Sequence, residues 1–251
     1  MNQDLDRIAR RAIALVDLTS LNDDDSDERI VELCQRASTP AGPVAAVCVY
    51  PRFVELAVAT LRANPATRAV RVATVVNFPG GDGRESEVLA EIDRALGDDA
   101  DEIDLVFPWR ALLAGDRRAG EQLVRAARER CGEHGLKVIL ETGELARPEA
   151  ILEAASIALD QGADFLKTST GKVRVNATPE AARVLLELIR DRGANAGFKA
   201  SGGLKTTEDA AVYLCLADEI LGPAWADPEH FRFGASSLLD DLIGRLPEGQ
   251  G

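Results

Sequence analysis

Residues 164–201, DFLKTSTGKVRVNATPEAARVLLELIRDRGANAGFKAS, hold one complete strand–helix–strand unit. Short apolar runs at Asp164–Thr168 and Gly197–Ser201 predict two strands. Between them, Pro179–Arg190 repeats apolar residues with the period of an amphipathic helix, and Pro179 suits its first turn. Two strands joined through a helix are usually parallel, so this stretch predicts an α/β fold.

The same alternation of strand and helix extends along the chain. Glu121–Cys131 has a second clear helical period. Six further apolar runs predict strands at Val44–Val49, Val70–Val75, Glu102–Val106, Lys137–Glu141, Asp218–Leu221 and Phe231–Gly234. The last connection, from Leu221 to Phe231, is too short for a full helix and predicts a turn. Eight strands without a polar linker favour a (β/α)8 TIM barrel, a single domain over residues 1–251 with a short N-terminal helix, and a doubly wound sheet is the alternative.

Composition and charge limit the class of partner. No apolar run approaches the roughly 18 residues that a membrane span needs, and residues 1–18, MNQDLDRIARRAIALVDL, resemble an amphipathic helix and not a signal peptide. We therefore expect a cytoplasmic, soluble protein. The formal charge of −13 disfavours nucleic acid and anionic membranes and favours a small-molecule partner. A homodimer is the protein assembly to consider, although the sequence does not fix the oligomeric state.

The lysines mark the candidate chemistry. Only five of the 29 basic residues are lysines, and the other 24 are arginines. An arginine cannot replace a lysine as a nucleophile because its guanidinium group stays protonated. Lys167 ends one predicted strand beside apolar Phe165 and Leu166, where burial and a second cation would lower the pKa of its amine. A solvated charge at a strand end is the alternative.

Two further segments carry polar groups to the same predicted end of the barrel. Lys199 ends the next strand and could meet Lys167 inside the barrel, since neighbouring strands lie about 4.8 Å apart. Gly202 and Gly203 follow it, either as an ordinary turn or as a loop whose backbone approaches a phosphate, with Lys205 nearby. Asp104 interrupts an apolar strand and is a candidate for proton transfer.

Other readings remain open for several of these residues. Asp104 could instead pair structurally with Arg110. Ser236 and Ser237 precede a predicted helix, where they could bind phosphate or simply cap the helix. The carboxylates of Glu141 and Glu144 close another strand without an evident role.

Neither a metal site nor a disulfide framework is predicted. The NDDD run at residues 22–25 lacks the spacing of a calcium loop, and the two histidines, His134 and His230, have no neighbour at ligand spacing. We therefore expect no metal and no other cofactor. The four cysteines lie far apart and are expected to be reduced and mostly buried: Cys34, Cys48, Cys131 and Cys215.

From about Asp17 to Leu239 the chain resembles the class I deoxyribose-phosphate aldolases. The segments that carry the resemblance are LTSLNDDD, CVYPRF, VVNFP, DEIDLVFPWRALLAG, ETGEL, DFLKTSTGKV, GFKASGG and FRFGASSLL, in family order. The resemblance implies that Lys167 forms a Schiff base, that Lys199 tunes it and that Asp104 is the acid/base group. It implies reversible cleavage of 2-deoxyribose 5-phosphate to glyceraldehyde 3-phosphate and acetaldehyde, in deoxyribose phosphate catabolism.

By the same resemblance, seven residues would bind the substrate. Asp17 and Cys48 match positions near the substrate, and five residues match the phosphate-binding part: Lys172, Gly202, Gly203, Ser236 and Ser237. The chain departs from the family where Ala200-Ser201 replaces a common Pro-Ala pair and Lys205 a common arginine, and it ends in EGQG without a terminal tyrosine. Three alternatives stay open, namely an aldolase for another phosphosugar, a metal-dependent lyase and a non-catalytic barrel that senses sugar phosphates.

Overall fold

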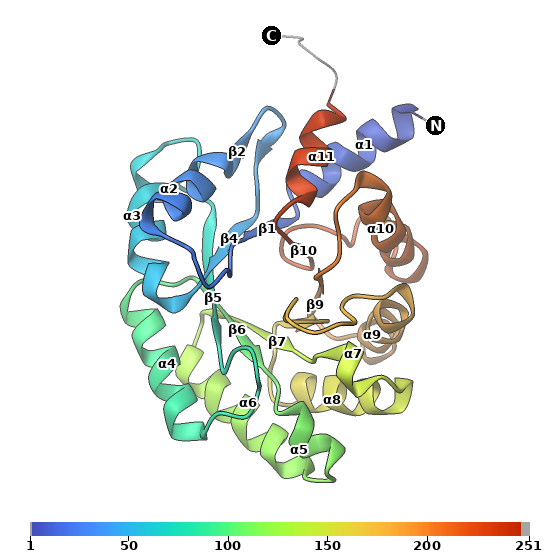
Figure 1. Cartoon of the computed structure of the whole chain (residues 1–251). Helices are drawn as coiled ribbons and strands as arrows, with labels where there is room; N and C mark the ends of the chain where they lie inside the picture. Colours follow the sequence, from blue (N-terminus) through green and yellow to red (C-terminus); the bar gives the residue numbers. More distant parts are fainter. Residues whose placement is uncertain (1, 247–251) are drawn as a thin grey trace.

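Eight parallel strands close into a barrel in the computed structural model, which describes residues 2–246 (Figure 1). The barrel strands are β1 (Val16–Thr19), β4 (Ala46–Val49), β5 (Arg71–Val76), β6 (Glu102–Val106), β7 (Gly135–Ile139), β8 (Phe165–Lys167), β9 (Gly197–Ser201) and β10 (Phe231–Ala235). Each strand pairs with the next along the chain, and β1 closes the barrel by pairing with both β4 and β10. The predicted (β/α)8 barrel is confirmed, and an open doubly wound sheet is excluded.

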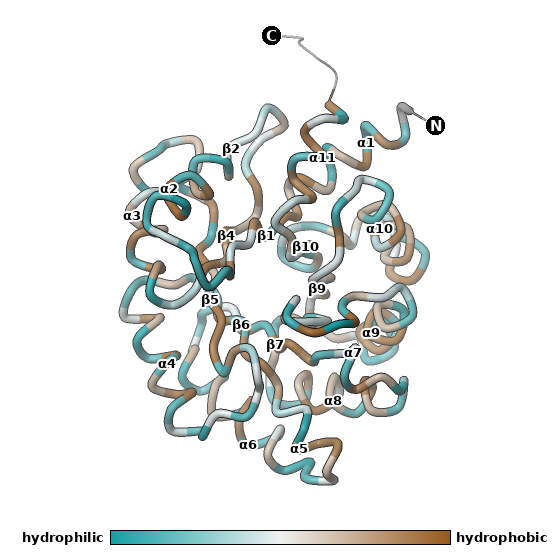
Figure 2. Tube along the Cα trace, viewed as in Figure 1, coloured by the Kyte–Doolittle hydropathy of each residue, from teal (hydrophilic) through white to brown (hydrophobic). Residues whose placement is uncertain are grey.

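Helices surround the barrel, and a small antiparallel pair, β2 (Ser38–Thr39) and β3 (Gly42–Pro43), lies outside it (Figure 1). The helices are α1 (Asn2–Ile13), α2 (Asp27–Arg36), α3 (Val54–Ala63), α4 (Glu85–Gly97), α5 (Trp109–Leu113), α6 (Arg117–Cys131), α7 (Thr142–Leu145), α8 (Pro148–Asp160), α9 (Pro179–Arg192), α10 (Thr207–Leu221) and α11 (Leu238–Gly244), with a 3-10 turn η1 at Pro51–Phe53. Figure 2 shows hydrophobic and hydrophilic residues alternating along the outer helices, as expected when one face packs on the sheet. Among residues 2–246, no helix combines the length and the apolar character that crossing a membrane requires.

Local sequence explains where several helices begin. The side chains of Ser26, Asp116 and Thr178 accept hydrogen bonds from the backbone at the starts of α2, α6 and α9. Thr206 and Asp209 form a reciprocal capping box at the start of α10. The predicted helices at Glu121–Cys131 and Pro179–Arg190 are confirmed within α6 and α9.

Two segments differ from the prediction. Asp218–Leu221 was expected to be a strand, but it is the last turn of α10. The eighth strand is instead β1, Val16–Thr19. Its residues 16–18 fall in the segment 1–18 that resembles an amphipathic helix, although α1 ends at Ile13. Both errors concern runs of four residues, which are too short for their hydrophobic period to separate strand from helix. The expected short N-terminal helix is confirmed as α1.

The barrel interior is charged and not purely apolar. Successive strand residues point to opposite faces, so Glu102 and Asp104 on β6 face the same side. Both are at most 2% exposed, whereas apolar residues such as Ile103 face the surrounding helices. Gly234 leaves room in this interior, because a Cβ atom there would lie 2.9 Å from Cε of Lys199. The fold therefore gathers buried charges inside the barrel.

Candidate active site

Two lysines and one aspartate meet inside the barrel. Lys167 and Lys199 lie side by side because β8 and β9 pair with these residues opposite each other. Both ammonium groups donate hydrogen bonds to the same oxygen, Oδ2 of Asp104, at 2.7 and 2.8 Å. All three residues are at most 2% exposed. The structure thus brings together the three residues that the sequence suggested for catalysis.

The two lysines differ in the number of carboxylates around them. Among the described residues, the Lys167 ammonium group pairs with Asp104 alone, whereas Lys199 also donates to Oδ2 of Asp17 at 2.5 Å. Burial lowers the pKa of Lys167, and the charge of Lys199 lowers it further against the opposing effect of Asp104. Burial also opposes the charge of Lys199, but Asp104 and Asp17 outweigh it and raise the pKa of Lys199. Lys167 is therefore the better candidate for a neutral amine.

Asp104 is held as an anion by three lysines. Burial alone would raise the pKa of Asp104, but Lys137, Lys167 and Lys199 outweigh it and hold that pKa well below its ordinary value. Lys137 contacts the second oxygen, Oδ1, at 2.9 Å. Each carboxylate oxygen therefore has at least one ammonium partner.

The alternative that Asp104 pairs with Arg110 is wrong. The Arg110 guanidinium group donates to the carbonyl of Gly80 and lies 3.9 Å from the centre of the Trp109 ring. It therefore sits outside the barrel interior, where a cation–π contact and a backbone acceptor take the place of the carboxylate.

Three further charged residues, which the sequence reasoning did not place in the site, extend this network toward the N-terminal ends of the strands. Arg232 donates to Asp17 at 2.7 Å and to Glu102 at 3.1 Å, and Lys137 donates to Glu102 at 2.5 Å. Burial opposes the charge of Glu102, but Lys137 and Arg232 lower its pKa to about 2. We call the whole group the ion cluster, and its members are Asp17, Glu102, Asp104, Lys137, Lys167, Lys199 and Arg232.

A pocket of about 220 Å³ opens at the mouth of the barrel, the end where the strands finish. It collects the residues that the resemblance assigns to phosphate: Lys172, Gly202, Gly203, Ser236 and Ser237, together with Lys205. Gly202 and Gly203 have φ angles of +83° and +84°, a backbone conformation that side chains strongly disfavour. The backbone conformation therefore explains why two glycines occupy this part of the pocket lining.

Glu141 supports the loop that carries Lys172. Its carboxylate accepts hydrogen bonds from the Thr170 hydroxyl at 2.6 Å and the Thr170 backbone amide at 3.2 Å. Thr170 in turn accepts from the backbone amide of Lys172 at 3.1 Å, and the Lys172 ammonium group donates to the Leu21 carbonyl at 2.6 Å. Glu141, whose role the sequence left open, therefore shapes one wall of the mouth pocket.

The serines at the mouth are exposed. Ser237 occupies the N-cap position of α11, but its side chain makes no capping hydrogen bond. Side-chain capping, the alternative considered from the sequence, is therefore not what Ser237 does in this structure. Both Ser236 and Ser237 line the mouth pocket.

Cys48 and the histidines lie in different surroundings. Cys48 is fully buried in the barrel interior beside Ala73 and Val75, and burial raises the pKa of its thiol. Cys34 and Cys131 are also buried and Cys215 is exposed, and all four thiols are free. His134 and His230 line a separate cavity at the N-terminal ends of the strands. Within residues 2–246, no group of three His, Cys, Asp or Glu side chains is arranged to hold a metal ion.

The family model of the DeoC/LacD family aldolases matches residues 11–242. The chain belongs to this family. Two solved structures that it resembles are each described as a "putative deoxyribose-phosphate aldolase". The one from Toxoplasma gondii has a TM-score of 0.89 at 27% identity and covers 98% of this chain and 96% of its own. The one from Coccidioides immitis has a TM-score of 0.80 at 26% identity and covers 96% and 97%.

A third structure, the tetrameric deoxyribose phosphate aldolase from Aeropyrum pernix, shares the fold at 22% identity and a TM-score of 0.74, with 96% of each chain covered. Family membership makes this DeoC/LacD aldolase an enzyme, so the alternative of a non-catalytic sensor is set aside. The tail EGQG, residues 248–251, lies outside the described residues.

Proposed function

We propose that this aldolase cleaves 2-deoxyribose 5-phosphate to glyceraldehyde 3-phosphate and acetaldehyde through a Schiff base on Lys167. The observation that carries the proposal is the sharing of one Asp104 oxygen by Lys167 and Lys199. Two ammonium groups around one carboxylate repel each other, and the member with fewer carboxylate contacts gives up its proton more easily. That member is Lys167.

The proposed reaction has three steps. Neutral Lys167 attacks the C1 aldehyde to form a carbinolamine, which loses water and becomes a protonated imine. The imine accepts the electron pair of the C2–C3 bond while the C3 hydroxyl loses its proton, so glyceraldehyde 3-phosphate leaves and an enamine remains. Protonation of the enamine at C2, followed by hydrolysis, releases acetaldehyde and restores the amine. Because the imine is itself the electron sink, the mechanism requires no metal and no other cofactor.

Asp104 and Lys199 are proposed to carry the protons of these steps. Lys199 stays charged beside Asp104 and Asp17, so it can donate a proton toward the carbinolamine hydroxyl. Asp104 touches both amines and can pass a proton from one to the other. Asp17 anchors Lys199 from the opposite side.

The mouth pocket is proposed to bind the 5-phosphate. Lys172 and Lys205 would supply positive charge there, which a substrate anion needs in a protein with a formal charge of −13. The Gly203 backbone amide and the hydroxyls of Ser236 and Ser237 would add hydrogen bonds, and Gly202 would let the loop backbone come close to the phosphate. The names of the Toxoplasma and Coccidioides relatives agree with this substrate.

The test is a substrate panel with the purified protein. We expect equal amounts of acetaldehyde and glyceraldehyde 3-phosphate from 2-deoxyribose 5-phosphate, at a rate that exceeds that on other phosphorylated aldoses and ketoses and is retained in chelator. Faster cleavage of another phosphosugar would reject the substrate but keep the chemistry. Loss of activity in chelator with recovery on added zinc would instead support the metal-dependent lyase.

A further inference from the structure

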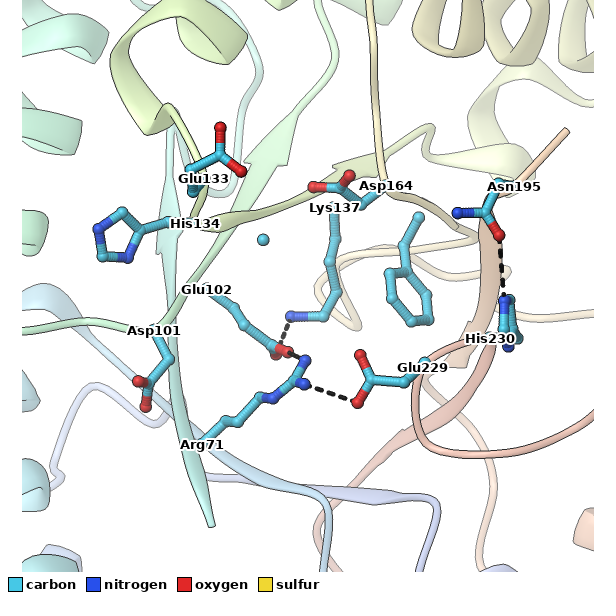
Figure 3. Close-up of a pocket in the computed structure, with 12 residues that line it drawn as sticks. Arg71, Asp101, Glu102, Glu133, His134, Lys137, Asp164, Asn195, Glu229 and His230 are labelled. Carbon is cyan, nitrogen blue, oxygen red and sulfur yellow. Dashed lines mark hydrogen bonds and ion pairs between the residues drawn. The ribbon is translucent and has the colours of Figure 1, made fainter. Parts of the chain in front are cut away.

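Lys137 is the third lysine of the ion cluster and lies on the side of Asp104 away from the mouth. It is fully buried, and its ammonium group contacts Asp104 Oδ1 at 2.9 Å, Glu102 at 2.5 Å and Asp17 at 3.9 Å. Figure 3 shows its side chain reaching Glu102, which also contacts Arg71. Lys137 lines the cavity at the N-terminal ends of the strands and is not part of the lining of the mouth pocket.

Lys137 fixes the orientation of the Asp104 carboxylate. It holds Oδ1, while Oδ2 alone faces the two lysines of the proposed reaction. Without a partner on Oδ1, the carboxylate could rotate about its Cβ–Cγ bond, a torsion with broad energy minima. The position of Asp104 Oδ2 relative to the Lys167 ammonium group would then no longer be held by the Lys137 contact on the other oxygen.

Charges within the cluster balance only when Lys167 is neutral. The cluster contains three carboxylates, Asp17, Glu102 and Asp104, each with its pKa lowered by neighbouring cations that overcome burial. Its fixed cations are also three, namely Lys137, Lys199 and Arg232. A charged Lys167 would add a fourth positive charge in a buried interior, where unbalanced charge is costly.

The other elements around Lys167 add little charge to this balance. Strand β4 contributes the Cys48 thiol, and β5 contributes the apolar residues Ala73 and Val75. At the edge, Arg71 is half-exposed and is offset by Glu229 as well as Glu102. Glu141 lies at the end of β7, and burial raises its pKa.

We propose that Lys137 is a positioning residue for the reaction of Lys167. Its ammonium group holds Asp104 from the N-terminal side of the barrel and supplies one of the three positive charges that balance the carboxylates of the ion cluster. This inference rests on the proposed Schiff-base function of Lys167. Lys137 acts through Asp104 and touches neither the substrate nor the reacting atoms. Glu102 carries the opposite charge and pairs with Lys137. Loss of the charge of either residue should therefore shift the pKa of Lys167, but in opposite directions.

The cavity beneath Lys137 makes the substitutions feasible. A space of about 650 Å³ opens at the N-terminal ends of the strands and is lined by Lys137, Glu102 and Arg71 (Figure 3). Changes at positions 137 and 102 therefore alter the lining of a cavity at the opposite end of the barrel from the mouth pocket. Any effect on imine formation would have to travel through Asp104 and the charge of the cluster.

The experiment measures how fast acetaldehyde and cyanoborohydride modify Lys167 across a range of pH. The midpoint of this profile reports the ionisation of Lys167. Lys137→Met removes a positive charge and should raise the midpoint by about one pH unit, which cuts the neutral amine roughly tenfold at a fixed lower pH. Glu102→Gln should lower the midpoint. The double variant restores the balance and should return it close to that of the unmodified protein.

Two controls separate charge from structure. Lys137→Arg keeps the positive charge and should leave the midpoint near its original value. Arg117→Gln removes an exposed positive charge of α6 that pairs with Glu121 on the surface, and it should not shift the profile. A residue that only filled space could not produce opposite shifts that cancel in the double variant.

The outcomes distinguish this inference from the proposed function. If the unmodified protein forms no adduct on Lys167, the Schiff-base function fails. If it forms the adduct but Lys137→Met leaves the midpoint unchanged, the inference is overturned while the function stands. Should Lys137→Met not fold, Glu102→Gln decides, because an unchanged midpoint in that variant contradicts the charge balance. Single-variant shifts that persist in the double variant also overturn it.

Discussion

The ion cluster and the mouth pocket use positive charge in opposite ways. Inside the barrel, Lys137 and Lys199 each contact at least two carboxylates and are fully buried. At the mouth, Lys172 donates to the Leu21 carbonyl, and among the described residues it forms no ion pair with a carboxylate. Paired buried cations hold a charge in place, whereas an unpaired cation near the surface is available to a substrate anion. The same residue type is therefore proposed to set ionisation in one region and to support substrate binding in the other.

Acid should damage the ion cluster more than any other part of the barrel. Neighbouring cations lower the pKa of Glu102 to about 2 although burial opposes this. The charged carboxylate therefore stabilises the fold fully at pH values above its ordinary pKa of 4.5, and this stabilisation is lost as the pH falls toward 2. Between pH 6 and pH 2.5 we expect the free energy of unfolding, measured by urea denaturation, to fall by about 2 to 3 kcal/mol through Glu102 alone.

The acid prediction has a matched pair of variants. In Glu102→Gln the decline between pH 6 and pH 2.5 should become shallower, because the titrating group is gone. Glu219→Gln breaks an exposed pair with Arg183 between α9 and α10 and should leave the decline unchanged. Identical slopes in both variants would mean that the buried carboxylates do not set acid stability.

Removing the charge of Lys199 should change catalysis next most strongly. Lys199→Leu takes a cation away from Lys167, and the pKa of Lys167 should rise because a neighbouring positive charge had been lowering it. A rise of about two units leaves roughly one hundredth of the neutral amine at neutral pH. We expect kcat/KM to fall by that factor and the activity optimum to move to higher pH. A near-native rate with an unshifted profile would show that the two lysines are not coupled.

At the mouth, a negative charge should affect only phosphorylated substrate. Ser237→Asp places a carboxylate where the phosphate is proposed to bind, and repulsion should lower kcat/KM for 2-deoxyribose 5-phosphate about tenfold, or about 1.4 kcal/mol. Unphosphorylated 2-deoxyribose should be cleaved at nearly the rate of the unmodified enzyme. Equal losses on both substrates would place the phosphate elsewhere. Ser236→Asp provides a neighbouring comparison on the same pocket rim.

The sequence predicted the barrel and the centre of its candidate site more readily than the surroundings of that site. The strong helical periodicity of Pro179–Arg190 and the β-rich runs around Lys167 and Lys199 predicted the α/β fold. Asp104 could be suspected because a lone carboxylate in an apolar strand needs a partner. Each of these signals is contained in a short stretch of chain.

Lys137, Glu102 and Arg232 were missed for a different reason. Each lies on a separate strand. Lys137 meets Glu102 across the paired strands β6 and β7, whereas Arg232 meets Glu102 because barrel closure brings positions 130 residues apart within hydrogen-bond distance. The one local hint was the spacing of Glu102 and Asp104, which places both on the same face of β6. Whether that face points inward could not be read from β6 alone.

The central claim is that Lys167 is the amine that forms the imine. Treatment with acetaldehyde and borohydride, followed by peptide mapping by mass spectrometry, should find one ethyl group on Lys167 together with irreversible loss of activity. Lys167→Arg should keep the positive charge and abolish the adduct, since a guanidinium group forms no imine. An ethyl group on Lys199, or on no lysine at all, would contradict the assignment.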